Sequence, residues 1–120
     1  MGNFRFEDLQ IWQKACAIGD RLDVIADDLE KQGKRRYAEQ LRGAALSVSN
    51  NIAEGSGSKS EKDFRNFLNI ARRSVFENAN MVLFLRRKGI VGAEAAAEFL
   101  DGLRVLSAQI AAFAKSLPRG

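Results

Sequence analysis

The side chains of this sequence that are best suited to bind a ligand are arginines in the middle of the chain. A guanidinium group is permanently charged and donates several hydrogen bonds, so it can contact phosphate groups without reading a base sequence. The phenylalanines recur at core spacing, not between the arginines, so stacking on bases is not indicated. Six arginines on two predicted helices are therefore our candidate nucleic-acid contacts: Arg35, Arg36, Arg42, Arg65, Arg72 and Arg73.

Charge is distributed unevenly along the chain. Residues 1–30 carry 3 basic and 7 acidic side chains, residues 31–88 carry 13 and 5, and residues 89–120 carry 3 of each. The basic middle segment suggests a face that attracts RNA or DNA. Two other interpretations stay open: an ordinary solvated helix surface, or a purely structural module whose arginines bind the acidic first helix of a neighbouring protein. The carboxylates for that pairing are Asp20, Asp23, Asp27 and Asp28.

Few groups in the sequence suit catalysis. There is no histidine, which removes the commonest general base and most zinc and copper sites. The single cysteine, Cys16, lies beside an apolar helix face, so we expect a small packing residue and not a nucleophile. The carboxylates in the middle of the chain lie on polar helix faces or at helix starts, where capping or ion pairing explains them: Glu54, Glu61, Asp63 and Glu77. We therefore expect no enzyme, no metal site and no cofactor.

Four stretches that carry these residues show the apolar spacing of amphipathic helices. Apolar positions alternate steps of four and three, which is the pattern of a helical bundle. The only proline is Pro118, so nothing interrupts a helix before it. We expect helices over residues 6–30, 35–54, 61–88 and 93–117. Short turns between long helices predict one all-α domain over residues 1–120, an antiparallel up-down-up-down four-helix bundle.

The predicted core combines residues from three of these helices: Leu41, Val48, Phe64, Leu68, Phe99 and Leu106. Gly55 is expected to end the second helix in a left-handed conformation. Asn78 interrupts the apolar face of the third helix, and either fixes the helix register from a buried position or lies at an exposed boundary. Phe4, Trp12 and Phe76 lie off the core seams, and such apolar surface often marks an interface, so we expect a homo-oligomer.

Residues 40–55, QLRGAALSVSNNIAEG, carry the most specific pattern of the chain. With Phe6, Leu9 and Trp12 before it and Phe64 and Phe67 after it, the chain resembles the four-helix-bundle proteins encoded in intervening sequences of bacterial 23S ribosomal RNA genes. The matching positions within the stretch are Gln40, Leu41, Arg42, Ala44, Ser47, Asn51, Ile52, Ala53, Glu54 and Gly55. Gly43 departs from that pattern, because an arginine is usual there.

The resemblance implies a four-helix bundle that is similar in fold to the accessory protein of diversity-generating retroelements. That protein forms a ring-shaped pentamer and partners a reverse transcriptase. A pentamer is therefore our best expectation for the homo-oligomer, with RNA, DNA or a nucleic-acid-handling protein as partner. Because Arg42 belongs to the signature, it has a second possible role, an ion pair with Glu39 or Glu54 inside the bundle.

Nothing in the sequence suggests a membrane partner. There is no apolar leader and no run of about 18 apolar residues. The lone cysteine fits a reducing compartment. We therefore expect a cytoplasmic protein.

Overall fold

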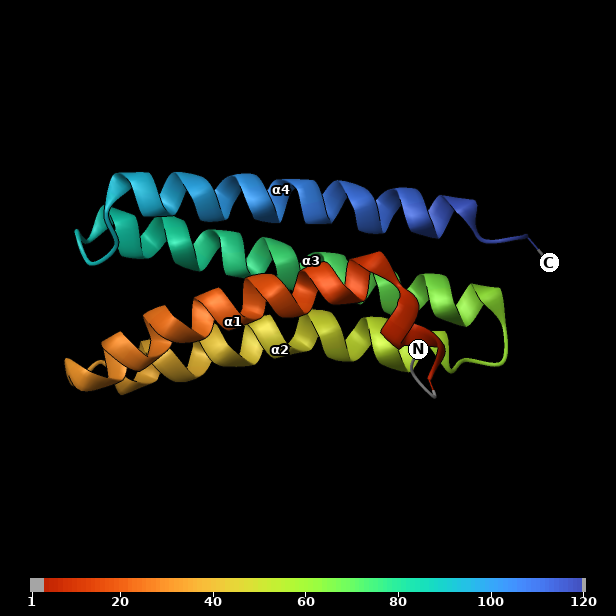
Figure 1. The fold of residues 1–120 in the computed structure, drawn as a ribbon, viewed down its shortest axis with the longest axis horizontal. Coiled ribbons are helices and arrows are strands. Elements are labelled where there is room, and N and C mark those ends of the chain that lie inside the picture. The colour runs from red at the N-terminus through yellow and green to blue at the C-terminus, as the bar shows by residue number, and fades with distance from the viewer. Residues whose placement is uncertain (1–3, 120) are drawn as a thin grey trace.

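A computed structural model describes residues 4–119 of the chain. It contains a short 3-10 helix, η1 (Arg5–Asp8), and four long helices: α1 (Gln10–Lys31), α2 (Arg35–Ser56), α3 (Glu61–Arg87) and α4 (Ala93–Ser116). There is no strand among the described residues. Figure 1 shows the chain running back and forth along its long axis, which measures 48 Å. The predicted all-α four-helix bundle is confirmed.

The four helices are arranged as the corners of a square. Each helix packs against the next one in sequence, and α1 also packs against α4, although less extensively. The diagonal pairs, α1 with α3 and α2 with α4, have no two Cα atoms within 8 Å of each other. Figure 1 shows α1 and α2 on one side of the bundle and α3 and α4 on the other. The outer surface of the α1–α2 pair therefore faces away from that of the α3–α4 pair.

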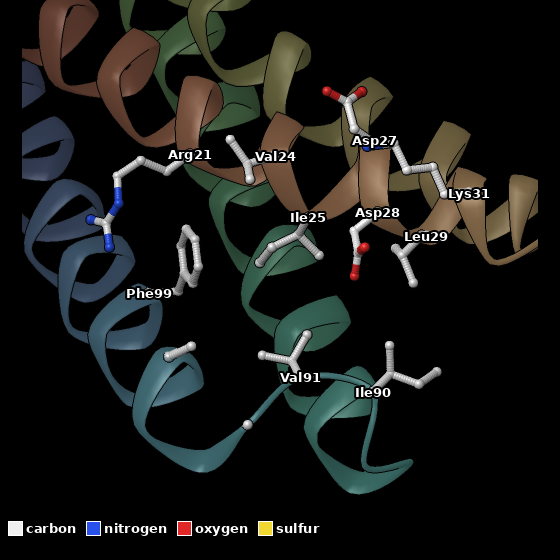
Figure 2. A pocket seen from close by; sticks show the side chains of 12 residues that line it. Arg21, Val24, Ile25, Asp27, Asp28, Leu29, Lys31, Ile90, Val91 and Phe99 are labelled. Atoms are coloured by element: carbon white, nitrogen blue, oxygen red, sulfur yellow. The ribbon is translucent and has the colours of Figure 1, made fainter.

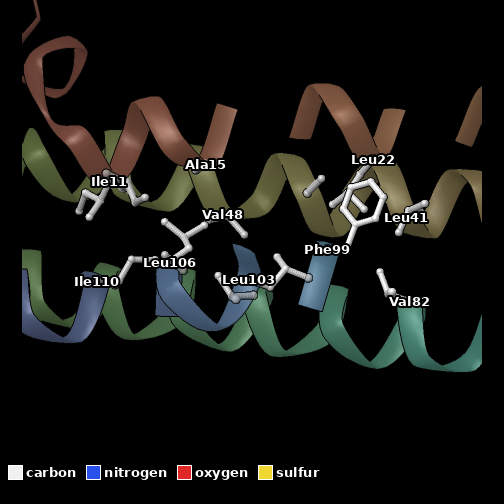
Figure 3. Close-up of a cluster of buried hydrophobic side chains, with 14 of the residues drawn as sticks. Ile11, Ala15, Leu22, Leu41, Val48, Val82, Phe99, Leu103, Leu106 and Ile110 are labelled. Carbon is white, nitrogen blue, oxygen red and sulfur yellow. The ribbon is translucent and has the colours of Figure 1, made fainter. Parts of the chain in front are cut away.

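The apolar stripes of all four helices meet in one core, part of which is shown in Figure 3. All six predicted core residues are buried in it. Asn78 is only 1 % exposed, so the alternative that left it at an exposed boundary is wrong. Its amide nitrogen has no hydrogen-bond partner among residues 4–119. A buried donor without a partner is costly, so the surrounding apolar contacts must offset this cost.

The turns follow local capping rules. The backbone N–H of Asp63 donates to the hydroxyl of Ser60 at 3.1 Å, which caps α3. Gly33 and Gly89, which follow α1 and α3, have φ angles of 80° and 75°. This left-handed conformation lets the chain reverse direction directly after each helix.

At the start of the first helix, the structure differs from the expected bounds. Residues 5–8 form the 3-10 helix, Leu9 is extended, and α1 begins only at Gln10. A side-chain hydrogen bond from Gln13 to the Glu7 carbonyl holds this turn, and the Phe6 ring meets the Trp12 ring edge to face at 5.1 Å. The 3-10 helix and the extended Leu9 therefore bring the Phe6 ring back against Trp12.

The expected role of Gly55 was wrong. The helix α2 continues through it to Ser56, and Gly55 is buried with helical geometry. A Cβ atom built on Gly55 would lie 2.7 Å from Cβ of Phe67 and 2.8 Å from Cδ1 of Phe64. Glycine is therefore required here because α3 approaches α2 closely, and not because the helix ends.

No helix within the described residues combines the length and the apolar character that a membrane span needs.

Candidate nucleic-acid interface

The six candidate arginines do not form one surface, and Arg42 is the clearest exception. Its guanidinium group donates to the carboxylates of Asp27 and Glu30, which reach it from α1. The hydrogen bond with Asp27, supported by Glu30, raises the pKa of Arg42 above its ordinary value. The expected pairing with Glu39 or Glu54 was wrong, because Arg42 lies on the side of α2 that packs against α1. Its charge is therefore neutralised within the bundle.

Two arginines of α3 are held against α4. Arg65 donates to the backbone carbonyl of Pro118 at 3.1 Å. Arg72 donates through Nε to the hydroxyl of Ser107 at 3.1 Å, and its guanidinium carbon lies 5.6 Å from the centre of the Phe76 ring. Arg73 is exposed and makes no hydrogen bond or ion pair within residues 4–119. Arg65 therefore lies near the start of α3, Arg72 and Arg73 lie near its middle, and the three do not gather in a cluster.

The remaining two candidates, Arg35 and Arg36, lie exposed in the first turn of α2. Figure 1 shows that the turn before α2 and the turn after α3 lie at the same end of the molecule. The rings of Tyr37 and Phe84 meet there edge to face, with centroids 5.8 Å apart. This contact joins the start of α2 directly to the last turn of α3. It brings together a group of cations that we call the cationic end: Lys34, Arg35, Arg36, Arg86, Arg87 and Lys88.

The charges of the cationic end are not neutralised by the protein. Five of its six side chains are exposed, Lys34 being half-buried. The four ion pairs within residues 4–119 involve none of the six. The nearby carboxylates of Asp27 and Glu30 bind Arg42, whereas Asp28 accepts a hydrogen bond from the neutral Gln32 amide and forms no ion pair with these cations. A cluster of unpaired cations on a low-dielectric body concentrates positive potential and attracts polyanions.

Only two members of this cluster, Arg35 and Arg36, were among the contacts predicted from the sequence. Lys34, Arg86, Arg87 and Lys88 were missed, because the cations before and at the start of α2 and those at the end of α3 form two separate triplets in the sequence. The signal was nevertheless present, because each triplet lies next to a turn glycine, Gly33 or Gly89. In a bundle whose chain reverses at every turn, the first and the third turn fall at the same end.

A hollow of about 690 Å³ lies beside the cationic end, between α1 and the start of α4. Figure 2 shows its apolar wall, with Ile25, Val91 and Phe99 pointing inward. The guanidinium of Arg21 lies 4.8 Å from the centre of the Phe99 ring, and Asp27 points away from the hollow. The side chains that line it include no histidine, cysteine or serine that could act as a nucleophile. The hollow offers apolar contact area, and charged side chains, Arg21, Asp28 and Lys31 among them, also line it.

The remaining groups to consider are possible metal ligands and the thiol of Cys16. Within the described part of the chain, no three Asp, Glu, His or Cys side chains come close enough together to hold a metal ion. Cys16 is half-buried on α1. Burial raises the pKa of its thiol, and the charge of Asp20 raises it further. A raised pKa keeps the group in the unreactive thiol form at neutral pH.

Comparison with known proteins identifies the family. The model of the 23S rRNA-intervening sequence protein family matches residues 7–112. The chain therefore belongs to this family, as its residues 40–55 suggested. A search of curated proteins finds no match.

Proposed function

We propose that this member of the family is a non-enzymatic helical protein that self-associates and binds the phosphate backbone of RNA through its cationic end. The observation that carries the proposal is the juxtaposition of six cations at one end of the bundle, none of which has an ion-pair partner within residues 4–119. Nucleic acid is the polyanion that such a cluster suits, since its phosphates are closely spaced along the strand.

The contacts in this proposal are electrostatic. Arginine and lysine bind phosphate oxygens and release counterions from the nucleic acid, so binding depends steeply on salt and little on sequence. Arg35 and Arg36 remain contacts from the original candidate set, and the other four cations of the cationic end join them: Lys34, Arg86, Arg87 and Lys88. Four candidates drop out. Other groups of the bundle hold three of them, Arg42, Arg65 and Arg72, and Arg73 lies near the middle of α3, away from the cationic end. Self-association would repeat the cationic end, so weak single contacts would add up.

The test is a pair of double variants that remove equal charge from opposite ends. Arg35→Ala with Arg36→Ala removes two cations from the cationic end, whereas Lys59→Ala with Lys62→Ala removes two exposed cations beside the α2–α3 loop. Binding to a labelled single-stranded RNA is measured over a range of salt concentrations. We expect the first variant to flatten the slope of log K against log salt by about 1.4, near 0.7 per lost contact. The second variant should leave the slope unchanged.

Circular dichroism of both variants should match the wild type, since alanine is a good helix former. If the first variant bound RNA as tightly as the wild type, the cationic end would not be the binding site. An equal loss in both variants would indicate an effect of net charge alone.

A second candidate function is a structural or protein-interaction module that binds no nucleic acid. It is favoured by unpaired carboxylates on α1, because Asp20 and Asp23 make no ion pair within the described residues. In this case the partner would be another protein or another copy of the chain. Assembly of the wild type without any RNA binding at low salt would select this alternative.

The number of subunits is part of the proposal. The resemblance to the retroelement accessory protein implies five, and sedimentation equilibrium at micromolar concentration measures it directly. A wild-type species of 13.3 kDa, the mass of one chain, would contradict self-association.

A further inference from the structure

The hollow between α1 and the start of α4, which we call the α1–α4 hollow, adjoins the cationic end along the chain on both of its sides. Ile90 and Val91 line one side and follow Lys88 after a single glycine. Lys31 lines the other side, on α1, and Lys34 follows it in the next turn of the chain. A ligand that lies on the cationic end can therefore extend into the α1–α4 hollow.

The wall of the α1–α4 hollow is mainly apolar. Ile25, Val91 and Phe99 point into it (Figure 2), and Val24 at its border is 68 % exposed. Its volume of about 690 Å³ falls in the range of pockets that bind small organic groups. Covering exposed apolar surface is favourable. The hollow therefore suits a small, largely apolar group.

The carboxylates at the α1–α4 hollow do not suit a phosphate. Asp27 binds Arg42 and points away from the hollow (Figure 2). Asp28 accepts a hydrogen bond from the Gln32 amide at 3.0 Å and forms no ion pair within residues 4–119. A carboxylate without a cation repels phosphate, but it accepts hydrogen bonds from the amino groups of a base. The uncharged part of a nucleotide therefore fits the hollow better than its phosphate does.

Arg21 adds a flat surface at the border of the α1–α4 hollow. Its guanidinium carbon lies 4.8 Å from the centre of the Phe99 ring, and its terminal nitrogen lies 3.7 Å from a carboxylate oxygen of Glu98. These two contacts hold the guanidinium group in place, while the Arg21 side chain remains 55 % exposed. Proteins stack the bases of unpaired strands on guanidinium planes and aromatic rings. A base is thus the part of a nucleotide that this surface suits.

We infer that the α1–α4 hollow receives one unpaired base of the RNA strand whose phosphates lie on the cationic end. The inference rests on the proposed function and names its substrate class, single-stranded RNA in preference to duplex. Every base of a duplex is paired and stacked, so none enters the hollow unless a pair is broken, which costs free energy. Stacking tolerates all four bases, because each has a flat face.

The test fills the hollow from α4. Ala95→Leu adds an apolar side chain at an exposed position that lines the hollow, whereas the matched control Ala97→Leu adds it at an exposed position that does not. Both residue types are good helix formers, so both variants should fold. Leucine is chosen because an aromatic side chain would itself stack on bases. Binding is measured over a range of salt concentrations for a labelled single-stranded RNA and for a blunt-ended RNA duplex of the same length.

We expect Ala95→Leu to weaken single-stranded binding about tenfold at every salt concentration, which corresponds to the loss of one stacked base. The slope of log K against log salt should stay unchanged, because an uncharged contact releases no counterions. Duplex binding by Ala95→Leu, and binding of both RNAs by Ala97→Leu, should equal that of the wild type. Unchanged single-stranded binding by Ala95→Leu would overturn the inference and favour an apolar protein segment as the occupant. An equal loss for the duplex would also overturn it.

Failure of the proposed function gives a different result. If the wild type bound neither RNA at low salt, the proposed function and the base site would both be wrong. If Arg35→Ala with Arg36→Ala flattened the salt slope while Ala95→Leu had no effect, only the base site would be wrong.

A photochemical cross-link locates the base in the unaltered protein. Single-stranded RNA that contains 4-thiouridine is irradiated in complex with the wild type, and the linked residues are identified by mass spectrometry. We expect links to residues that line the α1–α4 hollow, within 21–31 and 90–99. Links confined to residues 34–36 and 86–88 would place the bases outside the hollow and overturn the inference.

Discussion

At the scale of the residue, the glycines of α2 show how one residue type serves different purposes. Gly43 is exposed, and a Cβ atom built on it meets no atom within 4 Å. Gly55 is buried under Phe64 and Phe67, at distances that no ordinary side chain tolerates. The sequence pattern placed Gly43 inside the helix and Gly55 at its end, whereas the structure places both inside α2, where the position of α3 distinguishes them.

The two glycines predict opposite effects of the same substitution. Gly55→Ala should lower the free energy of unfolding by about 1–3 kcal/mol, because the added methyl group overpacks the α2–α3 contact. The matched control, Gly43→Ala, should raise it by about 0.5–1 kcal/mol through helix propensity. Urea denaturation at one protein concentration measures both. A stabilising Gly55→Ala would show that the close approach of α3 does not constrain this position.

At the scale of the element, the signature stretch of α2 is mainly a packing surface for α3. The hydroxyls of Ser47 and Ser74 lie 2.8 Å apart, and the Asn51 amide donates to the Ser47 carbonyl at 2.8 Å. One helical turn further, Gly55 admits the aromatic side chains of α3. The signature residues Ser47 and Gly55 are therefore explained by the contact between α2 and α3, whereas Arg42 of the same stretch binds carboxylates of α1.

Phe64 of α3 contacts both α2 and α4 in the core. It is 1 % exposed on α3, lies against Gly55 of α2, and meets the Phe113 ring of α4 edge to face at 5.6 Å. Phe64→Ala should lower the free energy of unfolding by about 3–5 kcal/mol. The control Ile70→Ala, at a site 42 % exposed on the same helix, should change it by no more than about 0.5 kcal/mol. A negligible shift of the urea midpoint for Phe64→Ala would contradict the assigned core.

At the scale of the whole molecule, the fold could be predicted and the candidate site only in part. Apolar periodicity identifies four helices, because each helix carries the apolar stripe that it must bury along one face. It does not show which neighbour lies on each flank of a helix, so Arg42 and Arg72 were grouped although they face opposite sides of the bundle. The cationic end could not be predicted from one stretch of the sequence. It forms because the turn before α2 and the turn after α3 lie at the same end of the bundle.

The central claim, that the bundle binds RNA by its phosphates, is tested most directly by a salt titration of the wild type. Fluorescence anisotropy of a labelled single-stranded RNA of random sequence measures the binding constant over a range of salt concentrations. With six contacts at about 0.7 each, we expect log K to fall with log salt at a slope of about −4. Sequences of different base composition should give the same slope. Absence of binding at low salt, or binding that salt does not weaken, would contradict the claim.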